Sequence, residues 1–236
     1  MIQVRRAQER GHAQHGWLDT WHSFSFADYY DPAHMGFSVL RVLNDDRIAP
    51  AMGFDPHPHR DMEILTWVLS GAVAHRDSMG NGSVIRPGEV QRMSAGTGVV
   101  HSEFNASADQ ELHLLQIWLL PSQRGLTPGY EQVAFPDEEL RHRWRLVASP
   151  DGRDGSVTLH QDALLRIARL QPGEELPVAL PSGRSAWLHV ANGAVRLGEA
   201  ALGAGDAVGL SGEPPLTLRA EQASEVLLFE LPPIRP

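Results

Sequence analysis

The sequence predicts an all-β protein built from two similar modules. Short runs rich in Val, Leu, Ile, Trp and Phe recur along the 236 residues, and no stretch shows a sustained 3.6-residue hydrophobic period. Turn dipeptides separate the runs, as at Asn81-Gly82, Asp151-Gly152 and Asn192-Gly193. Many short strands with frequent turns are typical of sandwiches and barrels rather than of a parallel α/β sheet.

The apolar runs place the expected strands in chain order. In the first half they lie at 37–43, 63–69 and 112–120, and in the second half at 164–170, 186–190 and 225–231. Between the halves, 136–142 predicts a short helix because Asp137, Glu138 and Glu139 would occupy its first turn.

A weak internal repeat supports the division into two modules. Residues 67–71 (WVLSG) resemble residues 189–193 (HVANG), and the segment from Gly88 resembles that from Gly205 in the same order. We therefore expect an N-terminal module over 1–135, a connecting segment over 136–144 and a C-terminal module over 145–236.

Composition excludes several kinds of chemistry. The net charge is −9, all twenty basic residues are Arg, and the chain has neither Lys nor Cys. Disulfides, thiolate nucleophiles, Cys-ligated metals and catalytic lysines are therefore excluded. The acidic balance gives no basis for direct nucleic-acid binding. No signal peptide or membrane-length apolar run is present, so we expect a cytoplasmic protein with no membrane partner.

Two histidine pairs have the spacing of side chains on one face of a strand. His57 and His59 are separated by one proline, and His101 and Glu103 repeat the same i, i+2 spacing. If two such strands adjoin, three imidazoles and one carboxylate share one space. These ligands suit Fe(II), Cu(II), Mn(II) or Ni(II) and leave two positions of an octahedral ion open.

A second carboxylate competes for the same role. Glu63 has the same parity as His57 and His59, so an unbroken strand would bring it to the same face. It could be a ligand in place of Glu103, a group that orients an imidazole, or a solvated residue. The spacing alone leaves these alternatives open.

Two segments resemble the motifs of the cupin superfamily. The first motif, G-x5-H-x-H-x3/4-E-x6-G, is matched by His57, His59, Glu63 and Gly71, and the second, G-x5-P-x-G-x2-H-x3-N, by Gly88, Gly96, His101 and Asn105. The match departs from the pattern, since Ser94 replaces the proline and His101 lies two positions late.

These departures are shared by the pirin branch of the superfamily, which the chain resembles over residues 16–120. The resemblance implies a bicupin fold of two packed jelly-roll barrels. The segments that carry it are 16–26, 31–32, 41–46, 56–60 and 101–105.

The pirin resemblance also implies a site. One mononuclear divalent metal ion would be held by His57, His59, His101 and Glu103, with Fe(II) the first expectation and Cu, Mn, Ni, Co or Zn as alternatives. The resemblance favours Glu103 over Glu63 as the ligand. In the C-terminal module the positions opposite His57, His59 and Glu63 are Ala179, Pro181 and Ser185, which implies a degenerate barrel without metal ligands.

Relatives of this kind imply a metal-dependent dioxygenase that cleaves the central ring of flavonols such as quercetin and releases carbon monoxide. Its partners would be a small aromatic substrate and O2, with Glu103, or alternatively Glu63, as the base that accepts the substrate's hydroxyl proton. Met52, Phe54 and Trp67 are candidates for an apolar substrate pocket. The alternative function is a non-catalytic, iron-binding redox or metal sensor that acts through protein–protein contacts.

Overall fold

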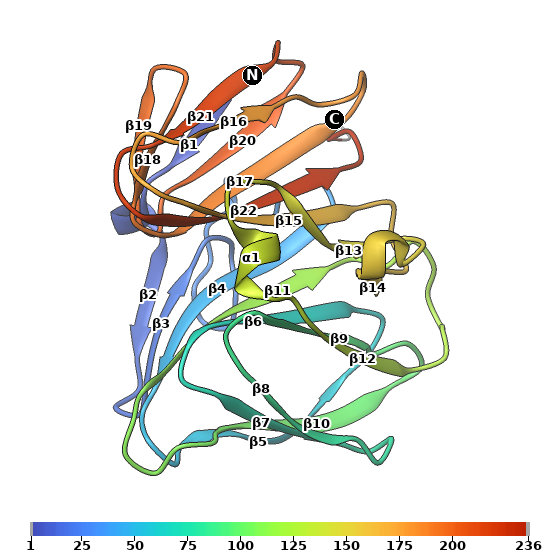
Figure 1. Cartoon of the computed structure of the whole chain (residues 1–236). Helices are drawn as coiled ribbons and strands as arrows, with labels where there is room; N and C mark the ends of the chain where they lie inside the picture. The colour runs from blue at the N-terminus through green and yellow to red at the C-terminus, as the bar shows by residue number, and fades with distance from the viewer. Residues whose placement is uncertain (1, 235–236) are drawn as a thin grey trace. The chain divides into compact units, whose positions relative to one another are not determined.

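Strands account for most of residues 2–234, the part of the chain that the computed structural model describes (Figure 1). Helical structure there is limited to α1 (Asp137–Leu140) and the 3-10 turns Ala7–Glu9 and Arg153–Gly155. Helix α1 lies within the expected 136–142 and ends at Leu140 because the backbone of Arg141 is extended. Among the described residues, no helix has the length and hydrophobicity needed to cross a membrane.

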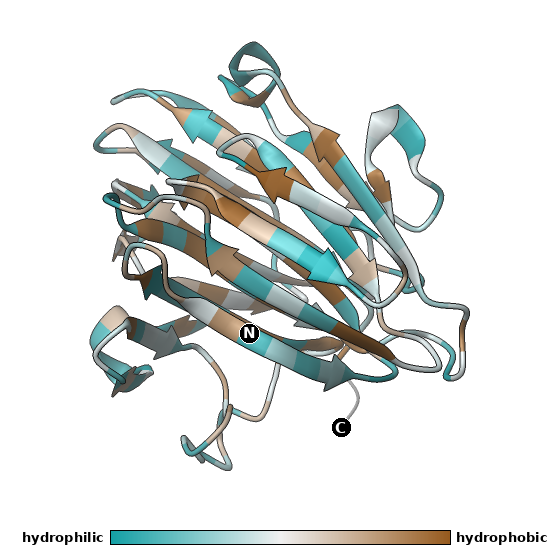
Figure 2. Ribbon diagram, turned by 90° about the horizontal axis from the view of Figure 1, so that it is seen from below, coloured by the Kyte–Doolittle hydropathy of each residue, from teal (hydrophilic) through white to brown (hydrophobic). Residues whose placement is uncertain are grey.

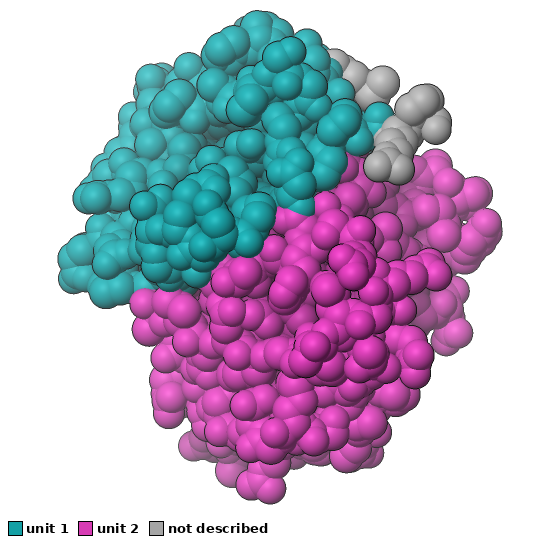
Figure 3. All heavy atoms as spheres, turned by 90° about the vertical axis from the view of Figure 1, so that its right-hand side faces the viewer, with its two compact units in different colours: residues 1–10, 135–156, 162–236 teal, residues 11–134, 157–161 magenta. Residues whose placement is uncertain are grey.

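The chain forms two compact units. Unit 2 comprises residues 11–134 and 157–161, and the other described residues form unit 1 (Figure 3). Two short segments differ from the expected ranges 1–135 and 145–236. The described residues within 1–10 belong to unit 1, with most of the C-terminal range, and residues 157–161 belong to unit 2, with most of the N-terminal range. Strand β1 (Ile2–Arg5) pairs with β20 (Ala207–Ser211) in unit 1, and the backbone N–H of Thr158 donates to Glu131 in unit 2.

Unit 2 contains two antiparallel sheets. Its strands are β2 (Gly11–Gln14), β3 (Leu18–His22), β4 (Leu40–Ile48), β5 (Gly53–His59), β6 (Glu63–Ser70), β7 (Val73–Asp77), β8 (Gly82–Ile85), β9 (Glu89–Ser94), β10 (Val99–Asn105), β11 (Leu112–Leu119), β12 (Gly129–Ala134) and β14 (Val157–Thr158). The larger sheet has the order β12-β9-β6-β11-β4-β3-β2, the smaller has the order β5-β10-β7-β8, and β14 belongs to neither of these two sheets. Val73 and Ile85 of the smaller sheet pack with Ile48, Val68 and Leu114 of the larger one, so the two sheets face each other.

Unit 1 repeats this arrangement. Its remaining strands are β13 (Arg145–Ser149), β15 (Leu164–Leu170), β16 (Glu175–Val178), β17 (Ser185–Asn192), β18 (Ala194–Leu197), β19 (Ala200–Gly203), β21 (Leu216–Ala220) and β22 (Ser224–Leu231). The order β20-β17-β22-β15 corresponds to β9-β6-β11-β4, and β16-β21-β18-β19 corresponds to β5-β10-β7-β8. The sequence repeat at 67–71 and 189–193 thus falls on the matching strands β6 and β17.

The all-β prediction is confirmed, whereas the expected closed barrels are not found. Each unit carries one large and one small open sheet, and none of the sheets described closes on itself. Hydrophobic and hydrophilic residues alternate along many strands (Figure 2), as expected for sheets with one buried face.

The interiors of the two units differ in chemistry. Unit 1 is filled by aliphatic side chains, including Val178, Leu188, Leu197 and Leu218. Unit 2 instead buries many polar side chains, including Asn44, Asp46, Thr66, Gln91, His101, Glu103 and Gln116. Because a buried polar group is costly unless it is paired, this polar interior points to a binding site in unit 2.

Candidate metal centre

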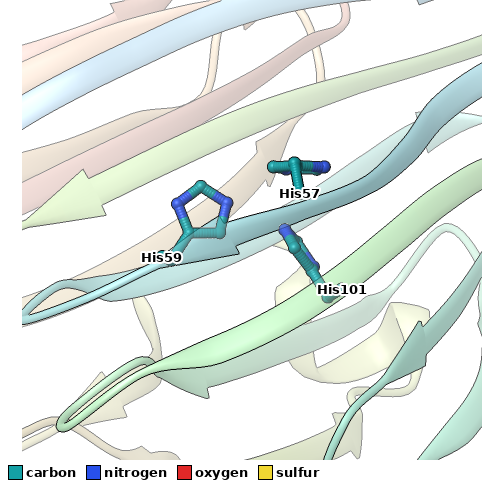
Figure 4. A group of neighbouring side chains, drawn as sticks. All are labelled: His57, His59 and His101. Carbon is teal, nitrogen blue, oxygen red and sulfur yellow. The ribbon is translucent and has the colours of Figure 1, made fainter.

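Three imidazoles meet over two neighbouring strands of the smaller sheet of unit 2. His57 and His59 lie on β5, and His101 lies on β10 directly opposite His57 in the strand register. The ring centroids are 4.8 Å apart for His57 and His59, 4.5 Å for His57 and His101, and 4.8 Å for His59 and His101. Figure 4 shows the three rings close together on the same face of the two strands.

A glycine at the start of β5 permits the close approach of the two strands. A Cβ atom at Gly53 would lie 2.3 Å from the carbonyl oxygen of Glu103 and 2.5 Å from the Cα of Phe104. Both are backbone atoms, so any side chain at position 53 would push β5 away from β10.

Two of the imidazoles have the hydrogen-bonding state that a metal ligand needs. Nδ1 of His57 lies 2.7 Å from the carbonyl oxygen of Asp55, which can only accept, so Nδ1 donates and Nε2 keeps its lone pair. His101 is 2% exposed, and neither of its ring nitrogens has a hydrogen-bond partner. A buried imidazole without a partner is unusual and indicates a missing ligand.

Burial and mutual proximity keep the imidazoles of His59 and His101 neutral. Burial, followed by the neighbouring His101 and His57, lowers the pKa of His59 to about 4. Burial, followed by His57 and His75, lowers the pKa of His101 to about 3. At neutral pH both rings therefore carry the lone pairs that metal coordination requires.

The donor set fits one metal ion. One ligand nitrogen from each of His57, His59 and His101 lies within 4.8 Å of the others. Nitrogens that bind one ion at about 2.0–2.1 Å lie at most about 4.2 Å apart, so small side-chain movements bring them to coordinating distance. Neutral imidazoles suit divalent transition metals.

Glu103 lies beside this cluster but is grouped with His75 and His101 rather than with His57 and His59. A β-bulge between His101 and Glu103 shifts the register with β5, and the carboxylate lies within 4.8 Å of ligand atoms of His75 and His101. Its Oε1 accepts hydrogen bonds from Thr66 and Gln91 at 3.2 Å each, and its Oε2 accepts one from Gln116 at 2.8 Å. Since a carboxylate oxygen can accept about two hydrogen bonds, Oε2 keeps one acceptor position.

Glu63 lies elsewhere. The chain turns between β5 and β6 at Asp61, which has a left-handed φ of 50°, so strand parity does not carry over from His59 to Glu63. The Glu63 carboxylate accepts a hydrogen bond from Ser94 Oγ at 2.9 Å and one from the backbone N–H of His160 at 3.1 Å. It belongs to neither group of metal-ligating side chains found in the described residues.

Two of the three candidate pocket residues line a cavity next to the cluster. Met52 and Phe54 lie with Trp17, Phe104 and His57 around a cavity of about 390 Å³. Trp67 is instead buried in the core of unit 2, on the interior strand β6.

Sequence reasoning missed His75, Asp77 and Trp118. His75 and Asp77 have the i, i+2 spacing of the other pairs, and β7 pairs with β10 so that Glu103 lies opposite His75. Trp118 packs edge-on against His59, with ring centroids 4.9 Å apart. The spacing of residues 75 and 77 was a usable signal, whereas the contact of Trp118 depends on how the two sheets face each other.

In unit 1 the strands that correspond to β5 and β10 carry apolar side chains in place of ligands. Leu176 and Val178 of β16 and Leu218 of β21 are buried in the aliphatic core. Among the described residues, both groups of metal-ligating side chains lie in unit 2.

Family models match both halves of the chain. The Pirin family model matches residues 3–119, and the model described as the quercetinase C-terminal cupin domain matches residues 146–231. A protein of Escherichia coli K12 named quercetin 2,3-dioxygenase is 50% identical over 234 residues, covering 99% of this chain and 100% of that protein.

Solved structures show the same architecture. The bacterial pirin YhhW of Escherichia coli in complex with nickel(II) superposes with a TM-score of 0.94 at 49% identity, covering 99% of this chain and 100% of that one. A quercetin 2,3-dioxygenase of Acinetobacter baumannii superposes with a TM-score of 0.75 at 25% identity, covering 98% of this chain and 86% of that one. With full-length relatives at half identity and a matching two-unit fold, the chain belongs to the pirin family and is a bicupin.

Proposed function

We propose that this protein is a metal-dependent dioxygenase that cleaves the central ring of flavonols such as quercetin, with release of carbon monoxide. The observation that carries the proposal is the cluster of three imidazoles beside a largely apolar cavity in unit 2. The 50% identity to a protein named quercetin 2,3-dioxygenase, over the full length of both chains, supports the reaction class.

We assign one divalent ion to His57, His59 and His101, with Glu103 as the fourth ligand through Oε2. The nickel(II) complex of the similar Escherichia coli pirin supports a single transition-metal ion. We propose Fe(II) as the working metal, because imidazole and carboxylate ligands with open positions are typical of iron oxygenases. Such an ion supplies Lewis acidity toward a substrate hydroxyl and a redox-active centre for reaction with O2.

The protein's own residues would position the substrate and accept a proton. Met52, Phe54 and Trp17 offer an apolar wall for a flat aromatic ring next to His57. The Asp55 carbonyl fixes the orientation of His57. Glu103 Oε2, which keeps one acceptor position, is the atom we propose to accept the proton of the flavonol hydroxyl whenever it is not ligated.

The test measures quercetin consumption and carbon monoxide release by the Fe(II)-loaded protein under O2. We expect turnover in the wild type and at least a ~100-fold loss in His101→Gln. His113→Gln is the matched control, because His113 is buried in the same unit and pairs with Asp45 away from the cluster. Intact quercetin in the presence of a protein that retains its iron would contradict the enzymatic function and leave the sensor alternative.

A further inference from the structure

A second group of metal-ligating side chains lies next to the three-imidazole cluster. His75 on β7, together with His101 and Glu103 on β10, offers three ligand atoms within 4.8 Å of one another. All three residues are buried, and His75 is 1% exposed. In the strand register, His75 lies opposite Glu103 and Asp77 lies opposite His101.

The hydrogen bonds of His75 orient it as a ligand. Its Nε2 lies 3.0 Å from Oδ2 of Asp77. The same Asp77 carboxylate accepts hydrogen bonds from Asn81 Nδ2 at 2.8 Å and from the backbone N–H groups of Met79 at 2.9 Å and Asn81 at 3.0 Å. Because both Asp77 oxygens act as acceptors, His75 Nε2 donates and Nδ1 keeps the lone pair.

The remaining nitrogen of His75 has no partner. Nδ1 is buried and makes no hydrogen bond, which is the state that a histidine ligand adopts when its other N–H donates to a carboxylate. The ring is held in place by Tyr130, whose ring centroid lies 4.9 Å away. Such an imidazole has an orientation fixed by Asp77 and a free lone pair.

We propose that His75, His101 and Glu103 form a second cation position, deeper in unit 2 than the three-imidazole cluster, for a divalent transition-metal ion. His75 binds through the nitrogen that Asp77 leaves free. His101 and Glu103 also belong to the position assigned above, and both ring nitrogens of His101 are buried without partners. Because a neutral imidazole has one lone pair, the two positions are alternatives for one ion.

Charge favours this deeper position. The Glu103 carboxylate is available to an ion in either position, whereas the Asp77 carboxylate lies behind His75 alone. The deeper position has the carboxylate of Glu103 as a ligand and that of Asp77 hydrogen-bonded to His75. Because a buried charge needs a compensating charge nearby, the two carboxylates favour a 2+ ion there.

The experiment removes the outer position and asks whether the chain still binds metal. In the His57→Gln/His59→Gln double variant we expect about one Co²⁺ bound per chain, measured by equilibrium dialysis with elemental analysis. Adding His75→Gln should weaken that residual binding at least ~10-fold. Adding His113→Gln instead should leave it unchanged, because His113 makes the same kind of buried hydrogen bond with Asp45 but lies in neither group.

Asp77→Asn covers the case in which the His75 variant does not fold. It removes the charge behind His75 and keeps the side-chain volume, so we expect Co²⁺ affinity in the double-variant background to fall by about 10–100-fold. Circular dichroism checks the fold of every variant.

Two results would overturn the proposal. One is a folded double variant that binds no Co²⁺, and the other is residual binding that His75→Gln and Asp77→Asn leave unchanged. The proposal does not rest on the dioxygenase function: residual Co²⁺ binding without quercetin turnover in the wild type rejects only the enzyme. Turnover in the wild type without residual binding in the double variant rejects only the second position.

Discussion

At the scale of residues, burial keeps several side chains of unit 2 neutral at pH values at which the same side chains would be charged in water. Burial lowers the pKa values of His59 and His101 to about 4 and about 3, and raises the pKa of Asp46 to about 7. The histidines therefore stay neutral where free histidine begins to charge, and Asp46 stays protonated where free aspartate is ionised. In the metal-free protein, these opposite shifts change the free energy of unfolding with pH in opposite directions.

The acidic side of that profile tests the histidines. Because their folded-state pKa values lie below the unfolded value of 6.5, their contribution to stability is present above pH 6.5 and is lost as the pH falls toward 3–4. Each imidazole adds a slope of up to about 1.4 kcal/mol per pH unit. Urea unfolding of the metal-free protein should therefore show a steeper acid loss for the wild type than for His101→Gln. Parallel profiles would contradict the assigned neutrality.

The contribution of Asp46 to stability changes with pH in the opposite direction. Its raised pKa means that its contribution is fully present below the unfolded value of 3.8 and is lost as the pH rises through about 7. Asp46→Asn removes the ionisation, so the stability of the variant relative to the wild type should increase between about pH 4 and 7, by at most about 4 kcal/mol. The Asn amide oxygen can still accept the hydrogen bond from Thr20 Oγ1, so the substitution keeps that contact. A difference that does not change with pH would show that Asp46 is ionised throughout.

The two carboxylates can be separated by substitution. Glu103→Gln should lower metal affinity by at least ~10-fold, since it removes the charged oxygen next to His101. Glu63→Gln should leave metal affinity unchanged and reduce stability by about 1–3 kcal/mol, because its partners Ser94 and His160 lose a charged acceptor. Isothermal titration with Ni²⁺ and urea unfolding measure the two effects. The reverse pattern would make Glu63 the ligand.

At the scale of elements, the spacing of β5 and β10 sets the separation of His57 from His101. Gly53→Ala would place a methyl group against the backbone of Glu103 and Phe104 and push the strands apart. We expect at least a ~10-fold loss of Ni²⁺ affinity and a stability loss of about 1–3 kcal/mol. Gly82→Ala in β8 is the control, since its added Cβ meets nothing within 4 Å. Equal effects of the two substitutions would contradict the role given to Gly53.

The same elements show where sequence reasoning reached its limit. Strand periodicity correctly paired His57 with His59, and α1 was placed within two residues at each end. The positions of Glu63 and Glu103 could not be derived, because a left-handed turn at Asp61 and a bulge after His101 interrupt the strand phase. Neither irregularity has a local sequence pattern strong enough to predict it.

At the scale of the whole molecule, the repeat in the sequence predicted two similar modules but not the segments that they exchange. The membership of β1 in unit 1 depends on its pairing with β20, some 200 residues away, and residues 157–161 join unit 2 through contacts such as that of Thr158 with Glu131. Pairings over such distances depend on tertiary structure rather than on local preference. The more polar interior of unit 2, however, agrees with the sequence, in which most histidines lie in the first half of the chain.

This difference between the units predicts where metal stabilises the protein. Saturating Ni²⁺, at about 100 times its dissociation constant, should stabilise the fold by about 2.7 kcal/mol. Hydrogen exchange should show the first and largest gain in protection in β5 and β10, which carry the ligands, compared with β16 and β21. Protection that increases in β16 and β21 alone would place the ion in unit 1.

The convergence of His57, His59 and His101 on one ion is tested most directly by anomalous diffraction from crystals grown with Ni²⁺ at a limiting ratio. The account predicts a peak at about 2.0–2.2 Å from one nitrogen of each of these three rings. A peak that contacts none of the three, in protein that has bound the metal stoichiometrically, would contradict it.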